Sequence, residues 1–273
     1  MIQVRKRFGQ HFLEPVWVDK VIKAIAPQPD QHFYEIGSGP GALTRPLTQR
    51  AKSVTAFEID RDLATELEAA ALPNLTVVQG DFLSREIADF RLQIADSVRV
   101  AGNLPYNVAS PIMFKLIELH AAGLPLVDAT LMLQREVADR LVAGPGSKEY
   151  GVLSVLIQHA ADVDTVLKLP AGAFRPPPKV MSSLVRLRFR APSPPVQDAT
   201  FFAWMVQAVF TRRRKTLANA LLALDGRSGP PFPRPAETLA KAGLDGSRRP
   251  ETLSIAEFAR LADIYTALHR AVL

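Results

Sequence analysis

The sequence predicts an α/β fold with a mainly parallel central sheet, followed by a small all-helical domain. Short β-rich runs alternate with helical patterns from residue 32 to about residue 135, which is typical of βαβ units. Beyond residue 195 the apolar spacing is helical and no strand pattern is present. The composition agrees, because 273 residues with 48% hydrophobic side chains suffice for one large core and a smaller second domain.

Each expected strand is a short run rich in β-branched and aromatic residues. The expected strands are 32–36, 54–57, 75–78, 98–101 and 129–133. Apolar residues at helical spacing predict helices between them, for example at 63–71 and 112–121. Right-handed crossovers then place helices on both faces of the sheet.

A proline-rich run precedes the last expected strand. Residues 170–179 contain four prolines and a glycine, which predicts a loop, and residues 181–189 then alternate like a strand. We expect a linker at 191–195, followed by helices at 201–224, 236–242 and 255–268. The expected domains are therefore residues 1–190, which carry the sheet, and residues 191–273, which are helical.

Composition and charge restrict the class of protein. The sequence has no apolar run long enough to cross a membrane and no apolar signal segment, so we expect a soluble intracellular protein. The absence of cysteine excludes disulfides and thiolate chemistry, and five scattered histidines lead us to expect no metal. A net charge of +6 and a pI near 9.7 favour a polyanionic partner.

A glycine-rich loop follows the first expected strand. Residues 35–41 read Glu-Ile-Gly-Ser-Gly-Pro-Gly, with glycines where a backbone turns sharply and approaches a ligand closely. The spacing differs from the dinucleotide fingerprint and is more typical of methyltransferases. Gly37 and Gly39 are therefore candidate cofactor contacts, and a purely structural turn is the alternative.

Acidic residues follow the next two expected strands. Glu58 is placed to accept hydrogen bonds from ribose hydroxyls, and Asp81 to accept from an adenine amine. Phe82 or Leu83 would pack beside the ring. Either acid alone could be a helix cap or a solvated turn residue. Their joint position at successive strand ends favours a nucleoside site.

The sequence Asn103-Leu104-Pro105-Tyr106 follows the fourth expected strand and suits methylation of an adenine amine. The N6 lone pair is delocalised into the purine, so acceptors aimed at its N–H bonds favour the reactive geometry. The Asn103 side-chain oxygen and the Leu104 carbonyl are the expected acceptors. Pro105 would fix the turn, and Tyr106 would stack on the extracted base. The alternative is a structural Asx turn with a core tyrosine.

Seven segments share their order and spacing with one known family. They are 7–13, the Gly37 loop, 58–60, 80–81, 103–106, 174–180 and 212–217. In these segments the chain resembles the ribosomal RNA adenine N6-dimethyltransferases. The resemblance implies a Rossmann-like class I methyltransferase fold and S-adenosyl-L-methionine as the cofactor.

The resemblance also implies roles that the residues alone do not. His11 and Leu13 would help to close the cofactor site formed by Gly37, Glu58, Asp81 and Asn103. The position of His11 is often asparagine in the family, and a lone histidine is otherwise more often structural. Phe174 would pair with Tyr106 as a stacking clamp on the target base, with a core phenylalanine as the alternative.

Basic residues gather in segments that could contact RNA, although such runs are most often solvated surface. One run lies on the expected helix 201–224. The candidate RNA-binding residues are Arg5, Lys6, Arg7, Lys179, Arg212, Arg213, Arg214 and Lys215.

The loop 174–180 and the tail 249–254 resemble the branch of the family that acts on small-subunit RNA. That branch dimethylates two adjacent adenines in the 3′-terminal hairpin loop of 16S ribosomal RNA, which implies a cytoplasmic partner of the small ribosomal subunit. We expect a monomer. The alternatives are the macrolide-resistance branch, which acts on large-subunit RNA, a ribosome-assembly factor, and an adenine-specific DNA methyltransferase.

Overall fold

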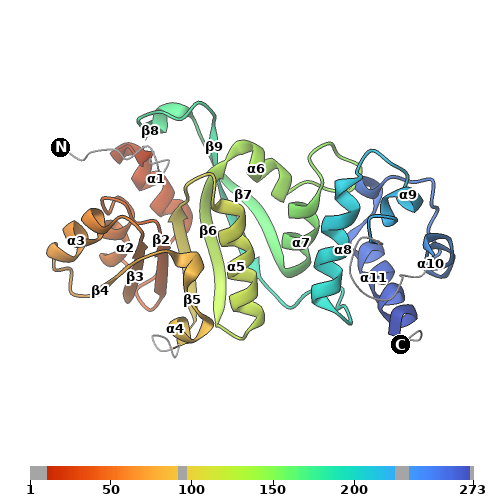
Figure 1. Cartoon of the computed structure of the whole chain (residues 1–273). Coiled ribbons are helices and arrows are strands. Elements are labelled where there is room, and N and C mark those ends of the chain that lie inside the picture. Colours follow the sequence, from red (N-terminus) through yellow and green to blue (C-terminus); the bar gives the residue numbers. More distant parts are fainter. Residues whose placement is uncertain (1–10, 92–96, 225–233, 271–273) are drawn as a thin grey trace. The chain divides into compact units, whose positions relative to one another are not determined.

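The computed structural model describes residues 11–91, 97–224 and 234–270, which divide into two units (Figure 1). The first unit extends to Ala138 and resumes at Asp162–Phe189. The second unit contains Asp139–Ala161 and the chain from Arg190 onward. Among the described helices, none is both long and apolar enough to cross a membrane.

The described residues of the first unit form a seven-stranded sheet in the order β4-β3-β2-β5-β6-β9-β7. The strands from β4 to β6 run parallel to their neighbours, and β9 pairs antiparallel with β6. The expected mainly parallel sheet is therefore confirmed. In chain order the strands are β2 (His32–Ile36), β3 (Ser53–Glu58), β4 (Leu75–Gln79), β5 (Val98–Asn103), β6 (Leu126–Gln134), β7 (Ala161–Leu169) and β9 (Ser182–Phe189).

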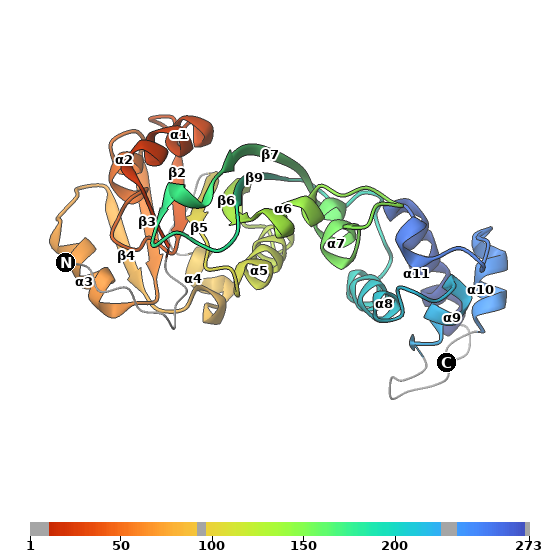
Figure 2. The same cartoon turned by 90° about the horizontal axis from the view of Figure 1, so that it is seen from above.

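Helices cover both faces of this sheet (Figure 2). On one face, Phe33 and Val54 join a buried apolar cluster with Val21 of α1 and Leu47 of α2. On the other face Tyr34 meets Phe57 edge to face at 5.2 Å. The helices of the unit are α1 (Pro15–Ile25), α2 (Thr44–Thr48), α3 (Arg61–Ala69), α4 (Ile87–Arg91), α5 (Ala109–Ala121) and α6 (Arg135–Leu141), which ends beyond the unit boundary.

The order of the strands reverses between β2 and β5. The chain runs outward from β2 to β4, and then returns to β5 and runs outward to the other edge. Glu35 pairs with Ala101 across these two central strands, so the loop after β2 lies beside the end of β5. Open α/β sheets bind ligands at this kind of reversal.

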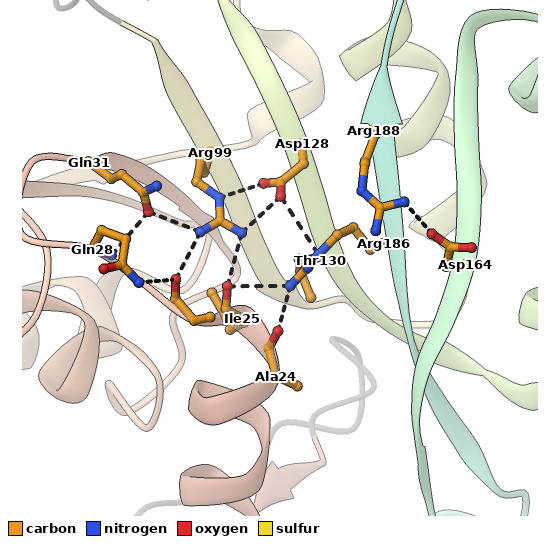
Figure 3. A network of polar contacts seen from close by, with 11 residues as sticks. Ala24, Ile25, Gln28, Gln31, Arg99, Asp128, Thr130, Asp164, Arg186 and Arg188 are labelled. Atoms are coloured by element: carbon orange, nitrogen blue, oxygen red, sulfur yellow. Dashed lines mark hydrogen bonds and ion pairs between the residues drawn. The ribbon is translucent and has the colours of Figure 1, made fainter.

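A buried polar network joins the end of α1 to the sheet (Figure 3). Arg99 on β5 donates two hydrogen bonds of 2.8 Å to the Asp128 carboxylate on β6. The same guanidinium donates to the carbonyls of Ile25 and Ala26, and Arg186 on β9 donates to that of Ala24. These bonds satisfy carbonyl groups that the end of a helix leaves without partners.

The second unit is helical from Arg190 onward, with no strand among its described residues there. Its helices are α7 (Val152–Ala160), α8 (Ala199–Thr211), α9 (Leu217–Leu221), α10 (Pro235–Ala242) and α11 (Ile255–Arg270).

The division into units differs from the expected contiguous one. Asp139–Ala161 belongs to the second unit, although the sequence analysis assigned it to the domain 1–190. The reason is that α7 packs against α8 and α11 of the second unit.

The helix expected at 201–224 is also interrupted. α8 ends at Thr211, and residues 212–216 form a turn before α9 begins at Leu217. Cations are favoured at the C-terminal end of a helix, where the unpaired carbonyl groups carry partial negative charge. Because α8 ends at Thr211, the four consecutive cations that follow lie in the turn and not on a helix face.

Candidate active site

Residues expected at the strand ends meet where the strand order reverses. The loop after β2 and the ends of β3 and β5 line one cavity, whose wall also includes β1 (Phe12–Leu13). A second cavity is lined by the turn after β4 and the start of α5. Both cavities are lined by Gly37, Ile59 and Pro105, so they are adjacent parts of one site.

The glycine loop has the backbone geometry that only glycine adopts readily. Gly37 and Gly39 have φ values of 73° and 53°. The Gly37 amide donates to the Phe57 carbonyl at 2.8 Å, and the Gly39 amide donates to the Glu58 carboxylate at 2.7 Å. The loop is thereby fixed to the end of β3, which brings both expected glycines into the first cavity.

Glu58 ends β3 with a carboxylate that is only 5% exposed. Its Oε1 accepts from the Asp60 amide at 2.8 Å, and its Oε2 accepts from the Gly39 amide. Burial raises the pKa of Glu58, while these amide bonds act to lower it. Each oxygen keeps a second lone pair, so the fixed carboxylate can also accept from ribose hydroxyls.

Glu35 is a candidate that the sequence analysis did not single out. Its side chain is 1% exposed and lines the first cavity, and its Oε2 has no hydrogen-bond partner among the described residues. Burial, with a smaller contribution from the charge of Glu58, raises the pKa of Glu35 to about 8. Its position directly before the glycine loop is the sequence signal that could have identified it.

The first cavity therefore fits the expected cofactor. S-adenosylmethionine carries a positively charged sulfonium and an ammonium group as well as a ribose. Glu35 and Glu58 place two buried carboxyl groups in one wall, and one of them keeps an unpaired oxygen. An opposite charge in such a wall compensates the cost of burying a cation.

The second cavity suits an aromatic ring. Phe82 is 4% exposed and meets Phe57 edge to face at 5.2 Å. The exposed Asp81 accepts from the Leu83 amide at 2.9 Å, which caps the short turn Phe82–Ser84. Ile59 lines both cavities and is 46% exposed, so its apolar side chain is available to a ligand. Ile59 was not identified from the sequence, although it directly follows Glu58.

The four residues from Asn103 to Tyr106 line the first cavity next to the cofactor candidates. The Asn103 Nδ2 donates to the His11 carbonyl at 2.8 Å, which leaves Oδ1 as the acceptor of the amide group. The Tyr106 hydroxyl lies 2.9 Å from the Ser182 hydroxyl, and burial raises the pKa of Tyr106. Ser182 was not identified from the sequence, because its proximity depends on how β9 enters the sheet.

His11 and Leu13 also line this cavity. The strand β1 pairs antiparallel with β8 (Phe174–Arg175), so that Leu13 lies opposite Phe174. The ring Nδ1 of His11 lies 2.8 Å from the Pro176 carbonyl. The described part of the N-terminal segment is thus held between the proline-rich loop and Asn103.

Phe174 is not positioned as expected. It is 3% exposed and belongs to the apolar cluster with Leu13 and Ile22, and it lines neither cavity. The pairing of β1 with β8 buries the ring against Leu13. In this structure Phe174 is the core phenylalanine that the sequence analysis kept as the alternative.

The candidate RNA-binding residues differ in their exposure and in the contacts that they make within the protein. Lys179, Arg212, Arg214 and Lys215 are exposed. Arg213 donates to the Lys148 carbonyl at 2.7 Å and lies 3.8 Å from Glu251, so it fixes the turn. The remaining candidates lie outside the described residues; they are Arg5, Lys6 and Arg7.

Comparisons with known proteins identify the family of the chain. The family model of ribosomal RNA adenine dimethylase matches residues 1–266. Ribosomal RNA small subunit methyltransferase A of Salmonella typhimurium is 42% identical over 263 residues, which are 95% of this chain and 92% of that protein.

Two solved structures share the fold along nearly the whole chain. A dimethyladenosine transferase from Plasmodium falciparum has a TM-score of 0.75 at 26% identity, covering 92% of this chain and 96% of its own. The 23S rRNA methyltransferase ErmE has a TM-score of 0.66 at 27% identity, covering 93% and 99%. The chain therefore belongs to the ribosomal RNA adenine dimethylase family.

Proposed function

We propose that this chain transfers methyl groups from S-adenosylmethionine to the N6 amines of two adjacent adenines, twice each. The proposed substrate is the 3′-terminal hairpin loop of small-subunit (16S) ribosomal RNA. Its dimethylation would contribute to small-subunit biogenesis in the cytoplasm. The relatives named ribosomal RNA small subunit methyltransferase A support this choice of RNA. Unpaired loop bases also suit the reaction, because moving them out of the RNA into the active site costs little free energy of unpairing and unstacking.

The cofactor would lie across the two adjacent cavities. Bound S-adenosylmethionine supplies a methyl group on a positively charged sulfur. Glu35 would face the positive charge, and Glu58 would accept from the ribose hydroxyls. In the second cavity Asp81 would accept from the adenine amine, while Ile59 and Phe82 pack against the ring.

The observation that carries the proposal is the position of Asn103 beside this cofactor site. Its Oδ1 and the Leu104 carbonyl would accept from the two N–H bonds of the target amine. These bonds stabilise the positive charge that develops as the nitrogen attacks the methyl group. The bond between the methyl carbon and sulfur would break as the carbon–nitrogen bond forms, which leaves a neutral thioether, and the product amine would then lose a proton to solvent. Stacking on Tyr106 would hold the base in line.

The exposed cations would contact RNA phosphates. Arg212, Arg214 and Lys215 are exposed side by side in the turn between α8 and α9. Lys148 is also exposed, and Arg213 holds its backbone next to the same turn. Such a cluster suits a phosphate backbone, since every cation that pairs with a phosphate releases a condensed counterion.

The test is transfer of labelled methyl groups to undermethylated small subunits, with large subunits and duplex DNA alongside, followed by nucleoside analysis. We expect dimethyladenosine only in the small-subunit RNA. Asn103→Ala should lower transfer by about 100-fold or more while both cofactor and RNA still bind. Full activity of this variant would remove Asn103 from the mechanism. Binding without any transfer by the wild-type chain would favour an assembly factor instead.

A further inference from the structure

An exposed arginine lies beside the first cavity, on the small sheet of β1 and β8. Phe12 and Arg175 are direct partners in this antiparallel pairing. Side chains of direct partners lie on the same face of a sheet, so the Arg175 side chain lies on the face of Phe12. Phe12 lines the first cavity. Arg175 therefore lies at the edge of the site, although it was not identified from the sequence.

The backbone around Arg175 is attached to the wall of this cavity. The Glu14 amide donates to the Ala173 carbonyl at 2.9 Å. On the other side of Arg175, the Pro176 carbonyl lies 2.8 Å from Nδ1 of His11, which also lines the cavity. The position of the arginine backbone is thus fixed on both sides.

The Arg175 guanidinium group is oriented but not buried. Its Nε lies 2.8 Å from Oε1 of Glu14, whose side chain makes no capping bond to the first turn of α1. The Arg175 side chain is nevertheless 85% exposed. Its two terminal nitrogens have no hydrogen-bond partner among the residues that the structure describes. These nitrogens are therefore available as donors to an anion.

A phosphate is the anion that an RNA substrate would bring to this position. An adenine whose amine meets Asn103 keeps its ribose and its two flanking phosphates, which continue outside the cavity. A guanidinium group is charged at every accessible pH, and its planar N–H groups match the oxygens of a phosphate. Because the ion pair with Glu14 already restricts the arginine side chain, less conformational entropy is lost when a phosphate binds.

We propose that Arg175 binds a phosphate that flanks the target adenine, and that Glu14 positions the guanidinium group for this contact. This inference rests on the proposed function and adds a substrate-positioning residue at the edge of the site. The contact would hold the ribose–phosphate chain and not the reacting amine. It should therefore act on the KM for RNA and leave kcat nearly unchanged.

The test combines protein variants with modified RNA. The probe is a hairpin RNA in which each phosphate that flanks a target adenine is replaced, one at a time, by an uncharged methylphosphonate. Arg175→Ala removes the guanidinium group. Lys23→Ala is the matched control, because it removes one exposed cation from α1 of the same unit. RNA affinity, kcat, the KM for RNA and the affinity for S-adenosylhomocysteine are measured for each variant.

We expect wild type and Lys23→Ala to lose about threefold to tenfold in RNA affinity when one particular flanking phosphate is neutral. Arg175→Ala should bind intact RNA about threefold to tenfold more weakly than Lys23→Ala does. The same methylphosphonate should then cost it less than about twofold. Its kcat and its affinity for S-adenosylhomocysteine should stay within about twofold of wild type.

The part played by Glu14 is tested with two variants that lose the same charge. Glu14→Gln keeps an oxygen that can accept from Nε of Arg175, whereas Glu14→Ala keeps none. We expect Glu14→Gln to bind RNA at least as tightly as wild type, because it also removes a negative charge. Glu14→Ala should bind about twofold to fivefold more weakly than Glu14→Gln. Equal affinities of these two variants would overturn the positioning by Glu14.

Two results would overturn the phosphate contact while leaving the proposed function intact. One is an Arg175→Ala variant that binds intact RNA as tightly as Lys23→Ala. The other is an Arg175→Ala variant that remains as sensitive to every methylphosphonate as wild type. If the wild-type chain transfers no methyl group to any RNA, the proposed function fails and the contact fails with it.

Discussion

At the residue scale, the two buried carboxyl groups of the site differ in their hydrogen-bond partners. Glu58 accepts from two backbone amides, whereas Oε2 of Glu35 has no partner among the described residues. With a pKa raised to about 8, Glu35 is mostly protonated at neutral pH before a ligand binds. A cationic ligand favours the ionised form, so its binding below pH 8 should release a proton.

The first prediction concerns the stability of the ligand-free protein. The pKa of Glu35 is raised from 4.5 to about 8, so the folded state binds more protons than the unfolded state between these values. The contribution of Glu35 to stability therefore falls as the pH rises through this window. We expect Glu35→Gln to weaken cofactor binding, yet to gain in Tm relative to wild type as the pH rises. Thermal unfolding between about pH 5 and about pH 9 measures the second effect.

The matched control is Glu66→Gln, which changes an exposed side chain on α3 of the same unit. Its difference in Tm from wild type should not grow with pH. Parallel pH profiles for Glu35→Gln and wild type would contradict the proposed coupling.

At the scale of elements, the turn between α8 and α9 combines two kinds of cation. Arg213 bonds to the carbonyls of Ser147 and Lys148 and pairs with Glu251, while its neighbours Arg212 and Arg214 are exposed. The first kind connects three segments of the second unit. Of these cations, Arg214 can meet a phosphate without loosening the turn, whereas Arg212 donates to the Asn219 carbonyl at 3.2 Å.

The second prediction separates these roles. Arg213→Ala removes bonds from a charged donor to two carbonyls, so it should lower Tm by about 2–8 °C. Arg214→Ala should leave Tm unchanged and weaken RNA binding. Thermal unfolding and RNA titration of the two variants are the measurements. Equal Tm values for both variants would mean that the Arg213 contacts add nothing to stability.

Much of the sheet could be predicted from the sequence, because β2 to β6 are short apolar runs separated by helical patterns. The strand β7 was missed because it follows α7 directly, so that no turn residue separates the apolar residues of the helix from those of the strand. The small sheet of β1 and β8 joins residues about 160 positions apart, and no local pattern encodes such a pairing.

The position of the candidate site could be predicted for a similar reason. Gly37, Glu58, Asp81 and Asn103 were predicted because strand ends of a parallel sheet converge at one edge. Phe174 lines neither cavity, because its strand pairs with the distant strand β1 and its ring is buried there. Local sequence therefore specifies which strand ends carry chemistry, while long-range pairing decides which rings reach the site.

At the scale of the whole molecule, neither unit is a continuous piece of chain. The chain passes between the units after Ala138, after Ala161 and after Phe189. A fragment that ends near residue 190 would keep α7 but lose α8 and α11, against which α7 packs. The sheet unit and the helical unit should therefore be studied in one intact chain.

The last prediction asks whether RNA binding depends on the total charge or on the turn. Two triple variants each lower the net charge from +6 to +3 by changing exposed cations to Ala. The first changes the turn of the second unit, at Arg212, Arg214 and Lys215. The second is the control in the first unit, at Lys23, Arg61 and Lys168.

Because the two variants have equal net charge, long-range attraction to RNA is reduced equally in both. In our proposal only the turn variant loses local phosphate contacts. Log affinity falls with log salt, and each lost contact makes this dependence less steep by about 0.7–0.9. We therefore expect its slope to fall by about 2 units, whereas the control keeps nearly the wild-type slope and both keep cofactor affinity. Equal slopes for the two variants would show that net charge, and not the turn, attracts the RNA.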